Sequence, residues 1–178
     1  AIAKELVASL LDHAWAKPLP ANAGKGAQLL PIKPVDPASY FNGRFLSPGL
    51  AKSSDGWKWH VPDWKNISGI FRSTFAGMKL LCTEQAGSEV PIEFEGRAIG
   101  AYVLAGPDAG VLEVSINGGD YKRVNLYHRY SRGLHYPRTV MFATDLKPGK
   151  HTAQIRVALP KRSTLGNRTA RILQFTVN

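Results

Sequence analysis

The chain has 178 residues, with 23 Lys and Arg against 13 Asp and Glu, so its net charge is +10. This length accommodates one medium-sized domain with a lead-in, and a hydrophobic content of 44% excludes a chain that is disordered throughout. No apolar run approaches the ~20 residues of a transmembrane helix, and the single Cys82 excludes an internal disulfide framework. The basic charge fits nucleic acid, anionic lipid or an acidic polysaccharide, and equally a soluble domain with a basic surface.

Residues 1–17 contain the one good helix that the sequence predicts, Ala1–Trp15. Its apolar stripe at helical spacing consists of Ile2, Leu6, Leu10 and Leu11. Pro18 ends the helix, because proline lacks a backbone donor and restricts the preceding residue. Since the remaining chain looks all-β, we expect the natural packing partner of this stripe to lie outside the sequence. The opening AIAKELVASLL lacks an initiating Met, which suggests truncation or processing, with any export signal already removed.

Residues 18–55 are predicted to be a linker or strap. The segment contains six prolines: Pro18, Pro20, Pro31, Pro34, Pro37 and Pro48. This much proline favours an extended, poorly packed backbone. The later part also carries Tyr40, Phe41 and Phe45, for which a fully solvated tether would have little use, so we expect it to dock onto the following domain as an ordered strap.

The next segment, Gly56–Phe75, is rich in aromatic residues. Trp57 and Trp59 lie two residues apart, so on a strand their side chains would share one face. One interpretation is that they plug one end of a hydrophobic core. The other is a flat platform on which the C–H-rich face of a sugar stacks, with polar contacts from His60, Asp63 and Lys65.

Residues 56–178 also predict eight strands joined by turns. Val111–Ile116 alternates apolar and polar residues, and Asn117-Gly118-Gly119 after it favours a tight hairpin. The other predicted strands are Met78–Thr83, Val90–Glu95, Arg97–Leu104, Lys122–Leu126, Thr139–Ala143, His151–Leu159 and Arg171–Val177. Short strands at fairly even spacing predict an all-β fold, here an antiparallel jelly-roll-like β-sandwich preceded by one helix and a Pro-rich strap.

Two parts of the chain resemble a known family. The first helix, ending AWAKPLP, is similar to the last helix of an SGNH (GDSL-type) hydrolase domain, the one after its catalytic Asp-x-x-His block. The blocks IEFEGRAIGAYVLAGPDAGVLEVSINGG, LYHRYSRGLHYPRTVMFATDL and PGKHTAQIRVAL resemble the β-sandwich module attached to such hydrolases in polysaccharide-degrading bacteria. The resemblance implies a carbohydrate-esterase parent, an upstream hydrolase domain as partner, and a secreted or periplasmic location.

The catalytic motifs of that family do not stand in this sequence. There is no Gly-Asp-Ser nucleophile block, no oxyanion-hole Gly and Asn blocks, and no Asp-x-x-His; Asp12-His13 lacks the spacing. Ser131 and Ser163 lack the Gly-x-Ser-x-Gly elbow. We therefore expect no catalytic activity from this chain alone.

The segment Tyr127–Arg138 is a second candidate site, with three Arg, two His and three Tyr. The planar guanidinium of arginine can hold a carboxylate or sulfate through two hydrogen bonds, and tyrosine offers a stacking face. Alternatively, the tyrosines fill the edge of the core while the arginines pair with Asp and Glu, or the loop contacts the hydrolase domain.

No cofactor is expected. Cys82 has no Cys or His nearby at zinc-ligand spacing, and the surrounding arginines disfavour a cation near His128 and His135. Asp108, Asp120 and Asp145 stand in predicted turns, where a structural Ca²⁺ is conceivable but ordinary turn chemistry explains them as well.

Together these patterns predict a non-catalytic, carbohydrate-binding accessory module of an SGNH-type esterase, with an acidic polysaccharide as partner and no membrane partner. The expected ligand contacts are Trp57, Trp59, Tyr127, Arg129, Arg132, His135 and Arg138. One rival is a purely structural domain that stabilises or completes the parent esterase. The other is a nucleic-acid-binding domain, which the charge suggests but no nucleic-acid motif supports.

Overall fold

The structure is a computed structural model that describes residues 2–16, 40, 42–51, 55–159 and 168–178. The chain divides into two compact units, Ala1–Ser39 and Tyr40–Asn178. The predicted Pro-rich segment up to residue 39, and Phe41 after it, lie outside the described residues.

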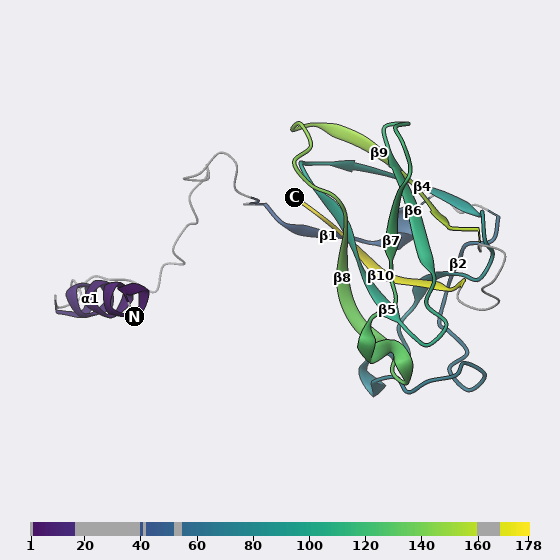
Figure 1. Ribbon diagram of the computed structural model, residues 1–178, viewed down its shortest axis with the longest axis horizontal. Coiled ribbons are helices and arrows are strands. Elements are labelled where there is room, and N and C mark those ends of the chain that lie inside the picture. The colour runs from purple at the N-terminus through teal and green to yellow at the C-terminus, as the bar shows by residue number, and fades with distance from the viewer. Residues whose placement is uncertain (1, 17–39, 41, 52–54, 160–167) are drawn as a thin grey trace. The chain divides into compact units, whose positions relative to one another are not determined.

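The first unit contains helix α1, Ile2–Trp15 (Figure 1), whose bounds agree with the predicted helix to within one residue. Along α1, three residues of the predicted apolar stripe, Leu6, Leu10 and Leu11, are 61%, 62% and 43% exposed. None of the described helices combines the length and the hydropathy needed to cross a bilayer.

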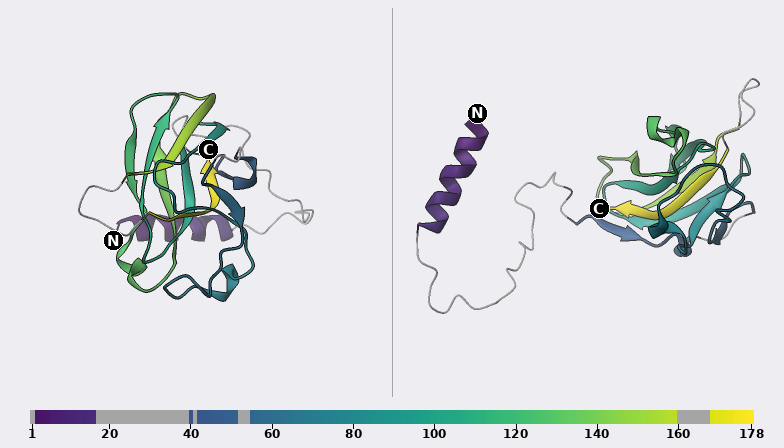
Figure 2. Two further views of the ribbon diagram at one scale, coloured as in Figure 1. Left: turned by 90° about the vertical axis from the view of Figure 1, so that its right-hand side faces the viewer. Right: turned by 90° about the horizontal axis from the view of Figure 1, so that it is seen from below.

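The second unit is a sandwich of two antiparallel sheets (Figures 1 and 2). The six-stranded sheet contains β1 (Arg44–Leu46), β2 (Lys58–His60), β3 (Leu80–Thr83), β5 (Ile99–Ala105), β8 (Tyr136–Ala143) and β10 (Ala170–Val177). The four-stranded sheet contains β4 (Glu89–Glu95), β6 (Val111–Ile116), β7 (Lys122–Asn125) and β9 (Lys150–Val157). Three short 3-10 helices, η1 (Pro48–Leu50), η2 (Ser73–Phe75) and η3 (Arg129–Arg132), lie in the connections.

The strands from β3 to β10 pair in nested fashion. β6 pairs with β7, β5 with β8, β4 with β9, and β3 with β10, all antiparallel. This is a hairpin of four strand pairs folded over into two sheets, which is the jelly-roll arrangement of eight strands. At its innermost turn Asn117 and Gly118 have φ angles of 53° and 75°, as a tight hairpin turn requires. The predicted all-β, jelly-roll-like sandwich is confirmed.

All eight predicted strands are present, and the sequence analysis missed β1 and β2. Each of these has three residues, too few for an alternating pattern to show. β1 pairs with β10, and the hydroxyl of Tyr40 donates a hydrogen bond of 2.8 Å to Asp145. Residues that the sequence assigns to the strap thus extend the six-stranded sheet.

Alternating side chains of both sheets fill the main core. It includes Ala101 and Val103 of β5, Ile155 and Val157 of β9, and Phe175 of β10. A smaller apolar cluster lies on the other face of the six-stranded sheet, where Phe75 packs with Leu80, Cys82 and Leu104. The long connection after β2 therefore covers part of the outer face of this sheet.

Candidate functional site

Five residues between β7 and the start of β8 form an aromatic–arginine cluster: His128, Arg129, Tyr130, Arg132 and Tyr136. A reciprocal cap shapes this segment, because His128 N donates to Ser131 Oγ (3.1 Å) and Tyr130 N donates to His128 Nδ1 (3.4 Å). Ser131 is fully buried. The cap starts η3 at Arg129 and holds the neighbouring rings in place.

The three rings of the cluster contact one another. The His128 and Tyr136 rings stack at 4.9 Å with an interplanar angle of 15°. The Tyr130 ring lies 5.1 Å from His128 and 5.2 Å from Tyr136. The Arg129 guanidinium sits 4.7 Å from the centre of the Tyr130 ring and donates a 2.8 Å hydrogen bond to its hydroxyl. Since Tyr130 is 48% exposed, the cluster presents an aromatic face beside a fixed cation.

The charge of the cluster is not neutralised within the described residues. Neither Arg129 nor Arg132 takes part in an ion pair of the described residues. Those ion pairs join Arg123 and Arg156 to Glu113, Arg156 to Glu89, and Arg171 to Asp108. Both of these arginines are exposed. The interpretation in which they pair with acidic neighbours therefore has no support in the described part of the chain.

Tyr127 and Arg138 flank the cluster and have structural contacts. Tyr127 is half-buried against the main core. Arg138 Nη1 lies 3.5 Å from Leu126 O and 3.4 Å from Tyr127 O. Arg138 therefore supports the connection that leads into the cluster, and it is less available to a ligand than the two exposed arginines.

The tryptophan pair lies elsewhere. Trp57 is 2% exposed, and its indole N–H donates a 3.0 Å hydrogen bond to Ser88 O, so its prediction as a sugar-stacking face is wrong and the core-plug interpretation applies. Trp59 is 39% exposed and pairs in register with Leu81. Its strand, β2, is separated from β8 by three strands, about 19 Å at 4.8 Å per step, so Trp59 does not join the cluster.

His135 is also buried, with no exposed surface, and this corrects its prediction as a ligand contact. Its Nε2 donates a 3.0 Å hydrogen bond to Ser68 O, and Trp64 meets its ring edge-on at 5.1 Å. The ring fits against Gly106 only because glycine has no side chain there. Burial, together with the charge of Arg171, lowers the pKa of His135, so the imidazole stays neutral and structural.

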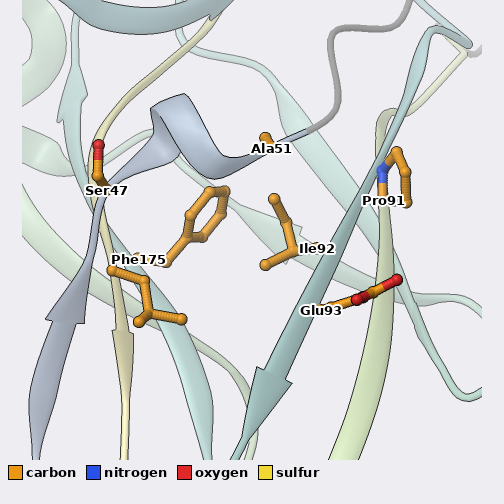
Figure 3. Close-up of a pocket in the computed structure, with 7 residues that line it drawn as sticks. Ser47, Ala51, Pro91, Ile92, Glu93 and Phe175 are labelled. Atoms are coloured by element: carbon orange, nitrogen blue, oxygen red, sulfur yellow. The ribbon is translucent and has the colours of Figure 1, made fainter.

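A small hollow opens at one edge of the sandwich, between β1 and β4. It has a volume of about 230 Å³, and its lining includes Phe175 of β10 together with Pro91, Ile92 and Glu93 of β4 (Figure 3). Its floor is made of the core residues Ile92 and Phe175, and Glu93 contributes a single charged side chain. It is therefore a gap in sandwich packing and a weaker candidate than the aromatic–arginine cluster, where several polar groups converge.

Two of the three aspartates considered for calcium, Asp108 and Asp145, have other partners. Asp108 accepts two hydrogen bonds from Arg171, and Asp145 accepts from Tyr40 and Thr144. Within the described residues, no three His, Cys, Asp or Glu side chains are grouped so that they could hold a metal ion.

Comparison with known proteins finds similar folds among solved structures. No family model and no curated protein matches the chain. A two-domain esterase active on acetylated mannans, crystallised with mannopentaose, is similar with a TM-score of 0.58 and 11% identity over 97% of this chain and 44% of that chain. A family two carbohydrate esterase from Cellvibrio japonicus is similar with a TM-score of 0.50 and 13% identity, over 76% and 32%.

An exo-β-1,3-galactanase from Phanerochaete chrysosporium is similar at the same TM-score of 0.50, with 21% identity over 77% of this chain and 29% of that chain. The chain thus spans less than half the length of each of these structures. At such identities the likeness establishes the β-sandwich fold that these carbohydrate-active proteins contain.

Proposed function

We propose that this chain is a non-catalytic accessory module of a carbohydrate-active esterase, and that its sandwich binds an acidic polysaccharide. The observation that carries the proposal is the exposed Tyr130 ring with Arg129 fixed beside it and Arg132 close by in η3. A tyrosine face stacks on a pyranose ring, and an arginine fork binds a carboxylate or sulfate. In this proposal Tyr127 and Arg138 have a supporting role, because their described contacts are with the core and with backbone carbonyls.

We also propose that α1 belongs to an upstream hydrolase domain of SGNH type. The exposed stripe of α1 supports this, because an amphipathic helix is stable when its apolar face packs against a partner. The similarity to a two-domain esterase extends over 97% of the chain, a share that includes residues of both units. A secreted or periplasmic location follows from such a parent.

The rival in which the module is purely structural draws on the burial of Trp57 and His135. It gives no account of two exposed arginines beside an aromatic face without acidic partners in the described chain. Native affinity electrophoresis through gels that contain acidic or neutral polysaccharides separates the two functions. We expect an acidic polysaccharide to retard the chain, and Arg129→Ala/Arg132→Ala to weaken the affinity about tenfold or more, since a charged hydrogen bond contributes roughly 1.5–3 kcal/mol.

The matched control is Lys122→Ala/Arg123→Ala, which removes two positive charges from exposed positions on β7. Its retardation should fall only slightly, as expected from net charge alone. The proposed site would be contradicted if the two double variants lost equal amounts of affinity, or if no acidic polysaccharide retarded the unmodified chain. If the unmodified chain binds single-stranded or duplex DNA with an affinity that falls steeply as salt is added, the result would favour the nucleic-acid rival.

A further inference from the structure

The outer face of the six-stranded sheet has two different halves. Over one half, Phe75 and Trp64 cover Leu80, Cys82 and Leu104. The other half presents large apolar side chains, with Phe45 of β1 65% exposed and Met141 of β8 46% exposed. An exposed Phe and an exposed Met on one face of a sheet, with two strands between them, indicate a contact surface.

The strand register aligns this half into two rows, which we call the outer strip. The first row runs Phe45, Thr176, Gly100, Met141, and the second runs Gln174, Tyr102, Thr139. At about 4.8 Å between neighbouring strands, the first row spans roughly 14 Å. This length suits several consecutive sugar rings rather than a single one.

The chemistry of the outer strip differs from that of the aromatic–arginine cluster. Neither row contains a charged side chain, although the chain carries a net charge of +10. Phe45 and Tyr102 offer rings, while Thr176, Gln174 and Thr139 offer hydroxyl and amide groups. Flat apolar faces edged by neutral hydrogen-bonding groups complement a pyranose, which has C–H faces and a rim of hydroxyls. By charge complementarity, this surface fits an uncharged ligand.

The centre of the first row contains an unused polar group. Thr176 Oγ1 is buried and has no hydrogen-bond partner in the described chain. It lies beside Gly100, where a β-carbon would come within 2.9 Å of it and within 2.8 Å of Met141 Sδ. Met141 therefore occupies the gap above the glycine. Methionine is unbranched and adaptable, so it can move aside and let a sugar hydroxyl reach Thr176.

We propose that the outer strip is a second glycan-contact surface, specific for a neutral polysaccharide. This rests on the proposed function of the module, but it concerns a different surface. Tyr136 and Met141 lie five residues apart on β8, about 17 Å along the strand. In register Tyr136 pairs with Ala105, which faces the core, whereas Met141 pairs with Gly100 on the outer face. The two surfaces can thus be tested separately.

The test uses the full chain in affinity gels with soluble mannan, glucomannan or galactan. We expect retardation in at least one of them that persists when NaCl is raised from about 0.1 M to about 1 M, which shortens the screening length from about 10 Å to about 3 Å. Phe45→Ala and Tyr102→Ala should each weaken the affinity on the order of tenfold. Leu159→Ala is the matched control, since Leu159 is an equally exposed apolar residue (68%), and it should bind as the parent chain does.

The two binding surfaces give separable outcomes. Phe45→Ala should keep acidic-glycan binding, and Arg129→Ala/Arg132→Ala should keep neutral-glycan binding. The proposed role of the outer strip is overturned if no neutral polysaccharide retards the chain, or if Phe45→Ala and Tyr102→Ala leave that retardation unchanged. The proposed function of the module then depends on the acidic gels alone. The proposal is also overturned if the unmodified chain binds no neutral glycan but self-associates in sedimentation, and Phe45→Ala removes this self-association. That outcome would assign the outer strip to contact between copies of the chain.

Discussion

His135 is buried as a neutral side chain, and this gives it a defined effect on stability. Its ring fills the space beside Gly106, and its Nε2 donates to Ser68 O. Burial first and the charge of Arg171 second lower its pKa below the ordinary value of 6.5. The folded protein therefore resists protonating His135 at pH values where the unfolded chain accepts a proton.

This pKa shift predicts acid sensitivity that begins near neutrality. The contribution of the neutral His135 side chain to the free energy of unfolding is fully present above pH 6.5. It is lost as the pH falls from 6.5 towards the lowered pKa of the folded state, at up to about 1.4 kcal/mol per pH unit. Urea unfolding should show a smaller free energy of unfolding at about pH 5.5 than at about pH 7.5. His135→Gln should be less stable at both values but less dependent on pH between them; an unchanged pH dependence would show that other groups cause it.

Among the structural elements, the turn between β5 and β6 is tied to β10 by a buried ion pair. Arg171 is 2% exposed, and its two terminal nitrogens donate to Asp108 at 2.8 and 2.7 Å. Burial alone would raise the pKa of Asp108, but the hydrogen bonds and charge of Arg171 hold it below its ordinary value. Thr169 N also donates to Asp108 O, so the turn is anchored through side chain and backbone.

Breaking this pair should destabilise the sandwich strongly. Asp108→Asn leaves the Arg171 guanidinium buried without a counter-charge, which costs roughly 3 kcal/mol of the free energy of unfolding. Glu113→Gln is the matched control on β6. It removes the counter-charge of Arg123 and Arg156, but these side chains are 50% and 34% exposed and stay solvated, so the change should cost about 1 kcal/mol or less. Chemical denaturation of the two variants at neutral pH measures the difference, and equal losses would contradict the special role of the buried pair.

At the same scale, long strands were easier to predict than short ones. Val111–Ile116 alternates over six residues and is present with the predicted bounds. β1 and β2 are ordered by backbone pairing with β10 and β3, and no periodic pattern marks a strand of three residues. The sequence also could not show that Trp57 is buried while Trp59 is partly exposed. The Trp57 indole is held by a hydrogen bond to Ser88 O, 31 residues further along the chain, and no local pattern indicates such a contact.

The candidate site shows the same division. The concentration of Arg and Tyr in Tyr127–Arg138 indicated the correct segment, but not which side chains stay exposed. His135 is covered because the connection after β2 reaches it through Ser68 and Trp64, a contact that depends on the whole sheet. Phe45 and Met141 were not predicted as glycan contacts. Met141 stands between the core residues Val140 and Phe142, so the alternation of side chains along the strand could have placed it on the outer face.

For the whole molecule, the division into two units predicts independent stability of the sandwich. The ten strands of the described residues lie in Tyr40–Asn178, and their pairings are contained within that unit. A chain that begins at Tyr40 should therefore unfold at the same temperature as the full chain, to within about 2 °C. Calorimetry of both chains measures this, and a clearly lower midpoint for the shorter chain would show that residues before Tyr40 stabilise the sandwich.

The nested strand pairing also governs how the protein is made. β10 lies between β3 and β5 in its sheet, so the sheet cannot close until Val177 has left the ribosome. Until then β3 and β5 lack the strand that separates them, and both expose edges that attract other chains. Folding must then bring together strands nearly the whole domain apart, which makes it slow. Biosynthesis therefore passes through a stage in which the nascent sandwich exposes unpaired strand edges, and a nonsense mutation that removes only β10 would abolish the fold rather than trim it.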